Sequence, residues 1–216
     1  MTRALVVLIV AIAWPAVAAE EDGLSSILKR VEQRYNRART IQVSFEQSYT
    51  APGRARTTER GELYLRKPGR MRWDYTQPAG KLFLSDGKHI YFYSPSTNRA
   101  EKSKLKESED LRAPLAFLLG KLDFSRDFDR YQYEKSGANT IVTAFPKNNR
   151  LPYTKVRFTV TPDYQISHLI VTGQDGSLNE FRFGLERINV LLKDSFFRFE
   201  LPPGAQFVDA TLTEGR

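Results

Sequence analysis

The sequence predicts a mainly β protein with a few helices (α+β), in which one large antiparallel sheet curls toward a barrel. Short segments of alternating apolar and polar residues recur at near-regular spacing and are separated by turn residues. Of two further segments, one has helical spacing and the other is almost wholly apolar. A curved sheet has one concave face, which such segments can cover. No linker or low-complexity stretch interrupts the 216 residues, so we expect a single domain.

The N-terminus has the pattern of an export signal. Arg3 precedes an apolar run over residues 4–13, and small residues follow up to Ala18 and Ala19. The run is too short to span a bilayer comfortably, and no cysteine follows it to accept a lipid. We therefore expect residues 1–19 to be removed and residues 20–216 to be released as one soluble domain in the periplasm; an uncleaved membrane anchor is the alternative.

Composition excludes several classes of chemistry and favours an acidic partner. The chain has no cysteine, which excludes disulfides, thiolate metal sites and thiol catalysis. Its formal net charge is +8. Because nucleic acid is a poor partner for an exported protein, anionic lipid headgroups or an acidic protein surface fit this charge better. Most of the basic side chains are nevertheless expected to be ordinary solvated strand faces.

The first elements are a helix, a strand and a hairpin. Residues 22–39 place apolar side chains three and four apart, which predicts an amphipathic helix of about 15 residues. Residues 41–49 alternate as a strand, and residues 61–78 alternate on both sides of a Pro-Gly turn. Counting by twos along the strand places Lys67 on the apolar face of this hairpin. A cation on that face needs a hydrogen-bonding partner, or its side chain must extend into water. The alternative is that Lys67 has already left the strand for the turn and points into solvent.

The remaining strands follow in order. A second hairpin is expected at 81–85 and 89–93 around an Asp-Gly turn, with a strand-like patch near 102–104. Residues 114–120 read as a short apolar helix that begins at proline and ends at glycine, and such a helix must cover something. Further strands are expected at 131–135, 140–145, 154–161, 166–172, 178–188 and 196–201, followed by a frayed tail.

The sequence offers no catalytic residue, metal site or cofactor motif. Ser85, Asp86 and His89 could be imagined as a triad, but Asp-Gly at this point is what a hairpin turn requires. Asp123, Asp127 and Asp129 lack the glycine-centred loop and closing carboxylate of a calcium site. We therefore expect a binding protein and not an enzyme.

The concave face carries more apolar side chains than one face needs. They either fill the sheet as a packed core or line a cavity, and the apolar helix around Phe117 and Leu118 favours a lid over a cavity that admits an apolar ligand. The candidate lining residues are Leu63, Leu65, Met71, Trp73, Tyr75, Phe117, Leu118, Phe158, Phe181 and Phe183.

The order of motifs resembles the outer-membrane lipoprotein carrier (LolA) family. The resemblance rests on FEQ at residues 45–47, GELYLRKPGRMRWDYTQP at 61–78, LFLSDGKHIYFYSP at 82–95 and PLAFLLG at 114–120. It runs through most of the chain after the signal, and the C-terminal half matches mainly in pattern.

The resemblance implies an incomplete, strongly curved barrel with a helical lid and a cavity for the acyl chains of lipoproteins. It further implies a monomeric periplasmic chaperone that takes acylated lipoproteins from an inner-membrane ABC-type releasing complex to an outer-membrane acceptor lipoprotein. Family members carry an arginine before the proline of the second block, where it holds the lid closed. Lys67 occupies that position here, and we expect it to bond carbonyls at a helix end as a looser latch.

Three other interpretations stay open at this stage. A carrier or sensor of another envelope lipid or glycolipid would show the same cavity in its sequence. An envelope hydrolase would need a nucleophile, and Ser85 is the one candidate; a purely structural protein would have no cavity at all.

Overall fold

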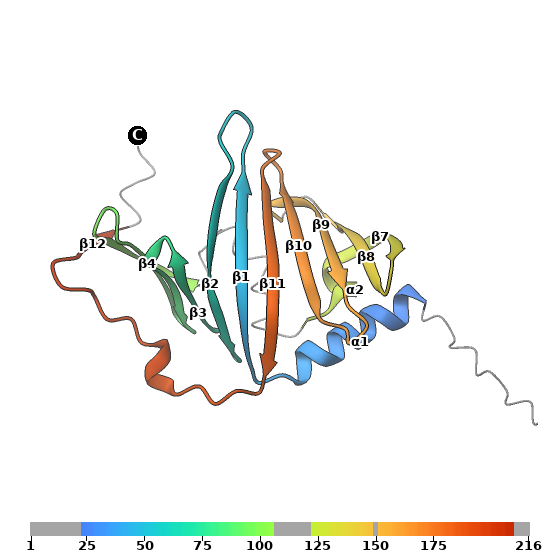
Figure 1. Ribbon diagram of the computed structural model, residues 1–216, viewed down its shortest axis with the longest axis horizontal. Helices are drawn as coiled ribbons and strands as arrows, with labels where there is room; N and C mark the ends of the chain where they lie inside the picture. Colours follow the sequence, from blue (N-terminus) through green and yellow to red (C-terminus); the bar gives the residue numbers. More distant parts are fainter. Residues whose placement is uncertain (1–22, 106–121, 149–150, 210–216) are drawn as a thin grey trace, which may run out of the picture.

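The computed structural model describes residues 23–105, 122–148 and 151–209, and within them a single open sheet of twelve strands dominates (Figure 1). The strands lie in the order β12-β6-β5-β4-β3-β2-β1-β11-β10-β9-β8-β7. Their bounds are β1 Thr40–Thr50, β2 Thr57–Arg66, β3 Arg70–Gln77, β4 Ala79–Asp86, β5 His89–Ser94, β6 Arg99–Lys104, β7 Phe128–Ser136, β8 Asn139–Pro146, β9 Tyr153–Val160, β10 Ile166–Gly173, β11 Leu178–Ile188 and β12 Gln206–Asp209. The helices are α1 Leu24–Arg37, α2 Phe124–Asp127 and the 3₁₀ turn η3 Asp194–Phe197.

The sheet is a meander in two halves that meet where β1 pairs with β11. Every neighbouring pair from β6 through β1 and β11 to β7 is antiparallel, as the tandem hairpins predicted. The exception is β12, which pairs in parallel with β6. The prediction of a wholly antiparallel sheet is therefore wrong at this edge. Because β7 and β12 are both edges, the sheet does not close into a barrel.

Helix α1 packs on the inner face of the sheet. Its apolar stripe of Ile27, Leu28, Val31 and Tyr35 is buried and belongs to the same core as the inward side chains of the strands. Residues three and four apart share one face of a helix, so this stripe follows directly from the sequence spacing. The helix expected over residues 22–39 is confirmed, and in Figure 1 it lies below β9 and β10.

Gly61 is required by a close approach of two strands. A Cβ placed on Gly61 would lie 2.1 Å from Asp74 O, the backbone of the neighbouring strand β3. The register between β2 and β3 shifts at Arg60 and Gly61, which brings the two backbones together. Only glycine fits this position of the 61–78 hairpin.

The strand expected at 196–201 is wrong, because η3 Asp194–Phe197 and irregular chain lie there. The expectation of a frayed tail is wrong over Gln206–Asp209, which form β12. After β11 the chain runs back along the outer face of the sheet to the far edge, and we call residues 189–205 the C-terminal strap (Figure 1). Its aromatic rings contact the sheet: Phe196 meets Tyr64 at 4.8 Å between ring centroids, and Phe199 stacks on Tyr91 at 4.8 Å. The apolar residues that suggested a strand are used to cover this face, and β12 then pairs with the edge.

Three predictions fall outside the described residues: the signal at 1–19, the apolar helix at 114–120 and the tail from 210 onward. In the part of the chain that the structure describes, no helix is both long and apolar enough to cross a membrane.

Candidate functional site

An apolar pocket of about 310 Å³ opens on the inner face of the β7–β10 half of the sheet. Its lining residues are Leu122, Phe124, Arg126, Asp127, Phe128, Leu151, Pro152, Tyr153, Val156, Phe158, Ile166 and Leu169. Strand alternation places Val156 and Phe158 on the inner face of β9. On β10 a bulge between Ile166 and His168 lets Ile166 and Leu169 share that face although they are three residues apart.

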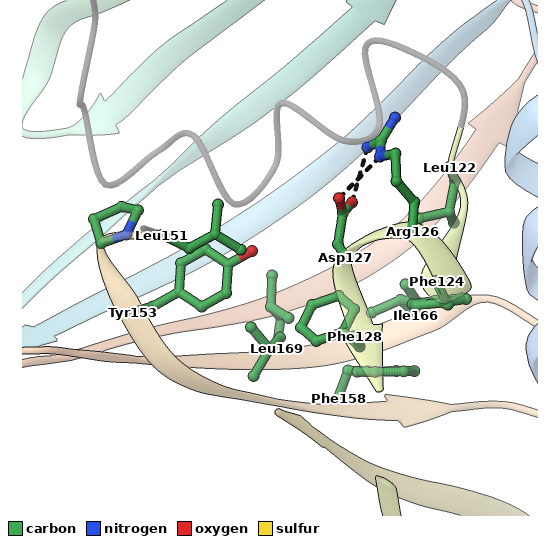
Figure 2. A pocket seen from close by; sticks show the side chains of 12 residues that line it. Leu122, Phe124, Arg126, Asp127, Phe128, Leu151, Tyr153, Phe158, Ile166 and Leu169 are labelled. Atoms are coloured by element: carbon green, nitrogen blue, oxygen red, sulfur yellow. Dashed lines mark hydrogen bonds and ion pairs between the residues drawn. The ribbon is translucent and has the colours of Figure 1, made fainter. Parts of the chain in front are cut away.

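Helix α2 and the first residue of β7 form one wall of the pocket, each with one phenylalanine. Phe124 stacks on Phe158 with ring centroids 5.3 Å apart, and Phe128 lies 6.4 Å from Tyr153 (Figure 2). Asp123 caps this helix, since its carboxylate accepts from Arg126 N at 3.1 Å. The wall is also tied to the sheet, because Tyr131 Oη donates to Phe124 O at 2.9 Å.

Helix α1 is hydrogen-bonded to the segment that leads into this wall. Asn36 donates from Nδ2 to Leu122 O at 2.8 Å and accepts from Leu122 N at 2.7 Å. Glu32 accepts from Phe124 N at 2.7 Å. The position of the pocket wall therefore depends on the position of α1.

The pocket holds one ion pair and is otherwise apolar apart from a tyrosine hydroxyl. Arg126 donates from Nε and a terminal nitrogen to the two oxygens of Asp127, each at 2.8 Å, and Figure 2 shows this pair standing apart from the aromatic rings. Burial, together with the charge of Asp127, raises the pKa of Tyr153 to about 12, so its hydroxyl stays neutral. An environment of this kind binds apolar matter by burial.

Most of the cavity residues expected from the sequence lie elsewhere on the same inner face. Phe158 lines the pocket, whereas Leu63, Leu65, Met71, Trp73, Tyr75 and Phe181 are each at most 4% exposed and belong to the packed core. Phe183 is partly buried against that core. The rings interlock, with Trp73 and Phe45 edge to face at 4.7 Å. Phe117 and Leu118 lie outside the described residues.

Lys67 makes a contact of the kind that was expected for a latch. It follows the last residue of β2 and is half-buried, and its Nζ donates to Tyr35 O at 2.7 Å, in the last turn of α1. Helix ends have carbonyls without intrahelical partners, and a cation suits that end of the helix dipole. Burial lowers the pKa of the Lys67 ammonium.

A second polar cluster holds α1 from β11, and sequence reasoning did not find it. Arg34 donates to Glu186 Oε1 at 2.7 Å, and Tyr35 Oη donates to Glu186 Oε2 at 3.0 Å while accepting from Ile166 N at 2.9 Å. Burial and the nearby Glu186 charge raise the pKa of Tyr35. Parity alone would place Glu186 on the outer face. An extra residue in β11 opposite Val43 and Phe45 turns it inward.

The imagined triad and metal site are not built. Ser85 is fully buried and donates to Gly69 O at 2.7 Å, while Asp86 Oδ1 accepts from the backbone N–H groups of Lys88 and His89 at 2.7 Å each. This is the hairpin turn that Asp-Gly predicted. Among the described residues no group of three or more His, Cys, Asp and Glu side chains could hold a metal ion.

The pocket residues that sequence reasoning missed had one available signal. Phe124 and Phe128 are four residues apart after Asp123, a spacing typical of one turn of helix with an N-cap. The ring partner of Phe124, Phe158, lies 34 positions away, and no local pattern could reveal that pairing.

Comparison with known proteins places this architecture in a family. A sequence model described as outer membrane lipoprotein carrier protein LolA matches residues 36–200. The chain belongs to the LolA family. The match covers β1 to η3, which includes the pocket and all strands except β12. It begins at Asn36, so most of α1 lies outside the matched residues.

Individual LolA relatives are similar along most of their length. The outer-membrane lipoprotein carrier protein of Proteus mirabilis is 27% identical over 180 residues, covering 83% of this chain and 86% of that protein. The protein of the same name from Nitrosomonas europaea is 24% identical over 209 residues, covering 96% and 99%. A solved structure of an uncharacterized conserved protein from Thermus thermophilus shares the fold with a TM-score of 0.53 and 12% identity, covering 86% of this chain and 98% of that one.

Proposed function

We propose that this LolA-family protein is a periplasmic carrier that binds the acyl chains of lipoproteins on the inner face of its open sheet. The apolar pocket of about 310 Å³ is the observation that carries the proposal. Burial of an acyl chain contributes about 0.8 kcal/mol per CH₂, and no polar group in the pocket other than one ion pair and the Tyr153 hydroxyl opposes it. The names of the curated relatives support the choice of lipoproteins as cargo.

Helix α1 acts as a lid in this proposal, together with the apolar segment at 114–120 that lies outside the described residues. Lys67 is its latch, through the bond to Tyr35 O. The packed residues of the β2–β3 hairpin, such as Trp73 and Met71, become accessible when α1 moves away, and the pocket then extends across the inner face. A moderate affinity results, because displacing α1 offsets part of the energy gained by burying the acyl chains.

The carrier takes its cargo from an inner-membrane ABC-type releasing complex and delivers it to an outer-membrane acceptor lipoprotein. It works as a monomer, without a cofactor and without catalysis. Its family membership supports this route.

The decisive experiment is to purify the exported protein from the periplasm and identify bound material by mass spectrometry. Triacylated lipoprotein is the expected result. Leu151→Trp should fill the pocket from its partly exposed rim and lower the affinity for a fluorescent acyl probe at least about tenfold. Leu178→Trp is the matched control, because Leu178 is 40% exposed and does not line the pocket.

A carrier of another envelope lipid is the second candidate, and one observation favours keeping it. The lining contains only the Arg126–Asp127 pair and the Tyr153 hydroxyl as polar groups, so nothing there selects a protein-linked chain over a free lipid. Recovery of phospholipid or glycolipid without lipoprotein would favour it. A protein that is empty and takes up no acyl probe would refute both candidates.

A further inference from the structure

A second hollow, distinct from the apolar pocket, lies where α1 ends and β1 begins. This basic groove has a volume of about 820 Å³ and is lined by Arg37, Arg39, Thr40, Arg66, Lys67, Asn189, Val190, Leu191 and Leu192. Four of these residues are cations and none is an acid. It shares no residue with the apolar pocket.

Two cations of the basic groove have no counter-charge among the residues that the structure describes. Lys67 is engaged with Tyr35 O, and Arg66 pairs with Asp194. Arg37 and Arg39 are exposed, and within the described part of the chain neither forms an ion pair with a carboxylate. Their charges are therefore available to an outside partner.

Other arginines of the sheet are arranged differently. Arg56 pairs with Glu180 at 3.1 Å, Arg60 with Glu46 at 2.7 Å and Arg72 with Asp74 at 2.8 Å. The pairs of Arg56 and Arg60 sit on solvated strand faces, whereas Arg72 lies beneath Phe196 of the C-terminal strap. The basic groove differs from these three sites, because each of their arginines lies beside a carboxylate.

A leucine projects from the rim of the same groove. Leu191 is 94% exposed. The backbone around Leu191 is anchored by hydrogen bonds to the carbonyls of both neighbouring residues. Val190 O accepts from Thr40 Oγ1 at 2.6 Å, and Leu192 O accepts from an Arg66 guanidinium nitrogen at 2.8 Å. The backbone thus fixes a large apolar side chain in water, where it loses the energy that burial would provide.

We propose that the basic groove docks the protein on a membrane surface that contains anionic phospholipids. Arg37 and Arg39 bind headgroup phosphates, for which the guanidinium fork is well suited, while Leu191 enters the apolar boundary below the headgroups. Cations around a protruding apolar side chain are typical of interfacial membrane binding. An acidic protein surface would neutralise the two arginines, but it would offer no apolar environment in which Leu191 could be buried.

This docking does not depend on which cargo fills the apolar pocket, and it is tested separately. The protein purified from the periplasm is mixed with phosphatidylcholine vesicles that contain either no phosphatidylglycerol or about a third of it, and binding is measured by flotation. We expect binding only to the anionic vesicles, weakened by added salt. Each juxtamembrane cation contributes about fivefold, so Arg37→Gln with Arg39→Gln should lower the partition coefficient about 30-fold.

Two further variants separate the docking surface from net charge. Lys135→Gln with Lys155→Gln removes the same charge from exposed positions on β7 and β9 and should leave binding unchanged. Leu191→Ser keeps every cation and should lower binding about tenfold. Thermal unfolding of each variant should match the wild type, since these side chains make no buried contact in the described residues.

Four outcomes would overturn the proposal. They are equal binding to neutral and anionic vesicles, an equal loss in the two double variants, and displacement by inorganic phosphate beyond that of chloride at the same ionic strength, which would indicate a free-anion site. The fourth is binding to polyglutamate but not to vesicles, which would indicate an acidic protein partner.

Discussion

Replacing Lys67 tests how α1 is held on the sheet. Lys67 Nζ donates to Tyr35 O at 2.7 Å from a half-buried position. A hydrogen bond that involves a charged group contributes about 1.5–3 kcal/mol, and partial exposure to water favours the lower end. Lys67→Met keeps an apolar stem of similar length and removes the ammonium. We expect this change to lower the free energy that holds α1 in place by about 1.5 kcal/mol.

Hydrogen exchange of the α1 amides is the direct measurement. A loss of about 1.5 kcal/mol raises the population with α1 displaced roughly tenfold, so its amides should exchange about tenfold faster while those of β8 to β10 stay unchanged. Lys67→Arg retains donors and should behave more like the wild type. Lys88→Met is the matched control, since Lys88 is exposed in the β4–β5 turn. If Lys67→Met leaves α1 exchange at the wild-type rate, the contact does not hold the helix and the latch is refuted.

Three further changes probe the fold around the site. Glu186→Ala leaves the Arg34 guanidinium and a buried hydroxyl on α1 without their acceptor and should lower the free energy of unfolding in urea by about 3 kcal/mol, whereas Glu186→Gln should cost clearly less. Gly61→Ala forces a Cβ against backbone and should cost about 3 kcal/mol in the same assay; Gly23→Ala, which meets nothing within 4 Å, is its control, and equal costs would contradict the clash. The Arg66 guanidinium lowers the pKa of Asp194, so this pair stabilises the fold above the ordinary aspartate pKa and is lost as pH falls through the lowered value. The unfolding free energy of Asp194→Asn should therefore change less between about pH 6 and about pH 3 than that of the wild type.

Local periodicity predicted most of the fold. The strands from β1 to β5 and from β7 to β11, and helix α1, all have a repeat of two or of three to four residues that is visible in the sequence. The C-terminal strap did not follow this rule, because its phenylalanines are spaced like those of a strand but serve a different purpose. Phe197 is buried although its segment pairs with no strand, because η3 lies against β3 and β4. An apolar segment can pair with a neighbouring strand or cover the face of a sheet. Which of the two it does depends on the surface it packs against, and that surface cannot be read from the local sequence.

Parity identified the inner face but not where that face is hollow. Trp73 and Phe158 both point inward as predicted, yet Trp73 is packed against Phe45 and Phe181, while Phe158 lines the pocket. The difference arises from side chains contributed by distant segments, such as Phe124 from α2. A cavity is the volume left after all these contributions are summed, and no single strand carries that information.

In the proposed function α1 is a movable lid, and its contacts with the rest of the protein fit that role. Its polar attachments are spread over three elements: Lys67 beyond β2, Glu186 on β11 and Leu122 before α2. Water can replace each of these hydrogen bonds when the helix leaves, so the net loss for each is small compared with the loss of buried apolar area. The apolar stripe of α1 is different, because only another apolar surface can replace it. In the proposed cycle an acyl chain takes that place on the inner face, and the helix returns when the chain is delivered. A lid held by apolar contacts alone would open only when cargo replaces them. The polar attachments offer a second control, because Lys67 is part of the basic groove. A partner protein or a membrane surface bound at this groove can therefore shift the equilibrium between the closed and open positions of α1.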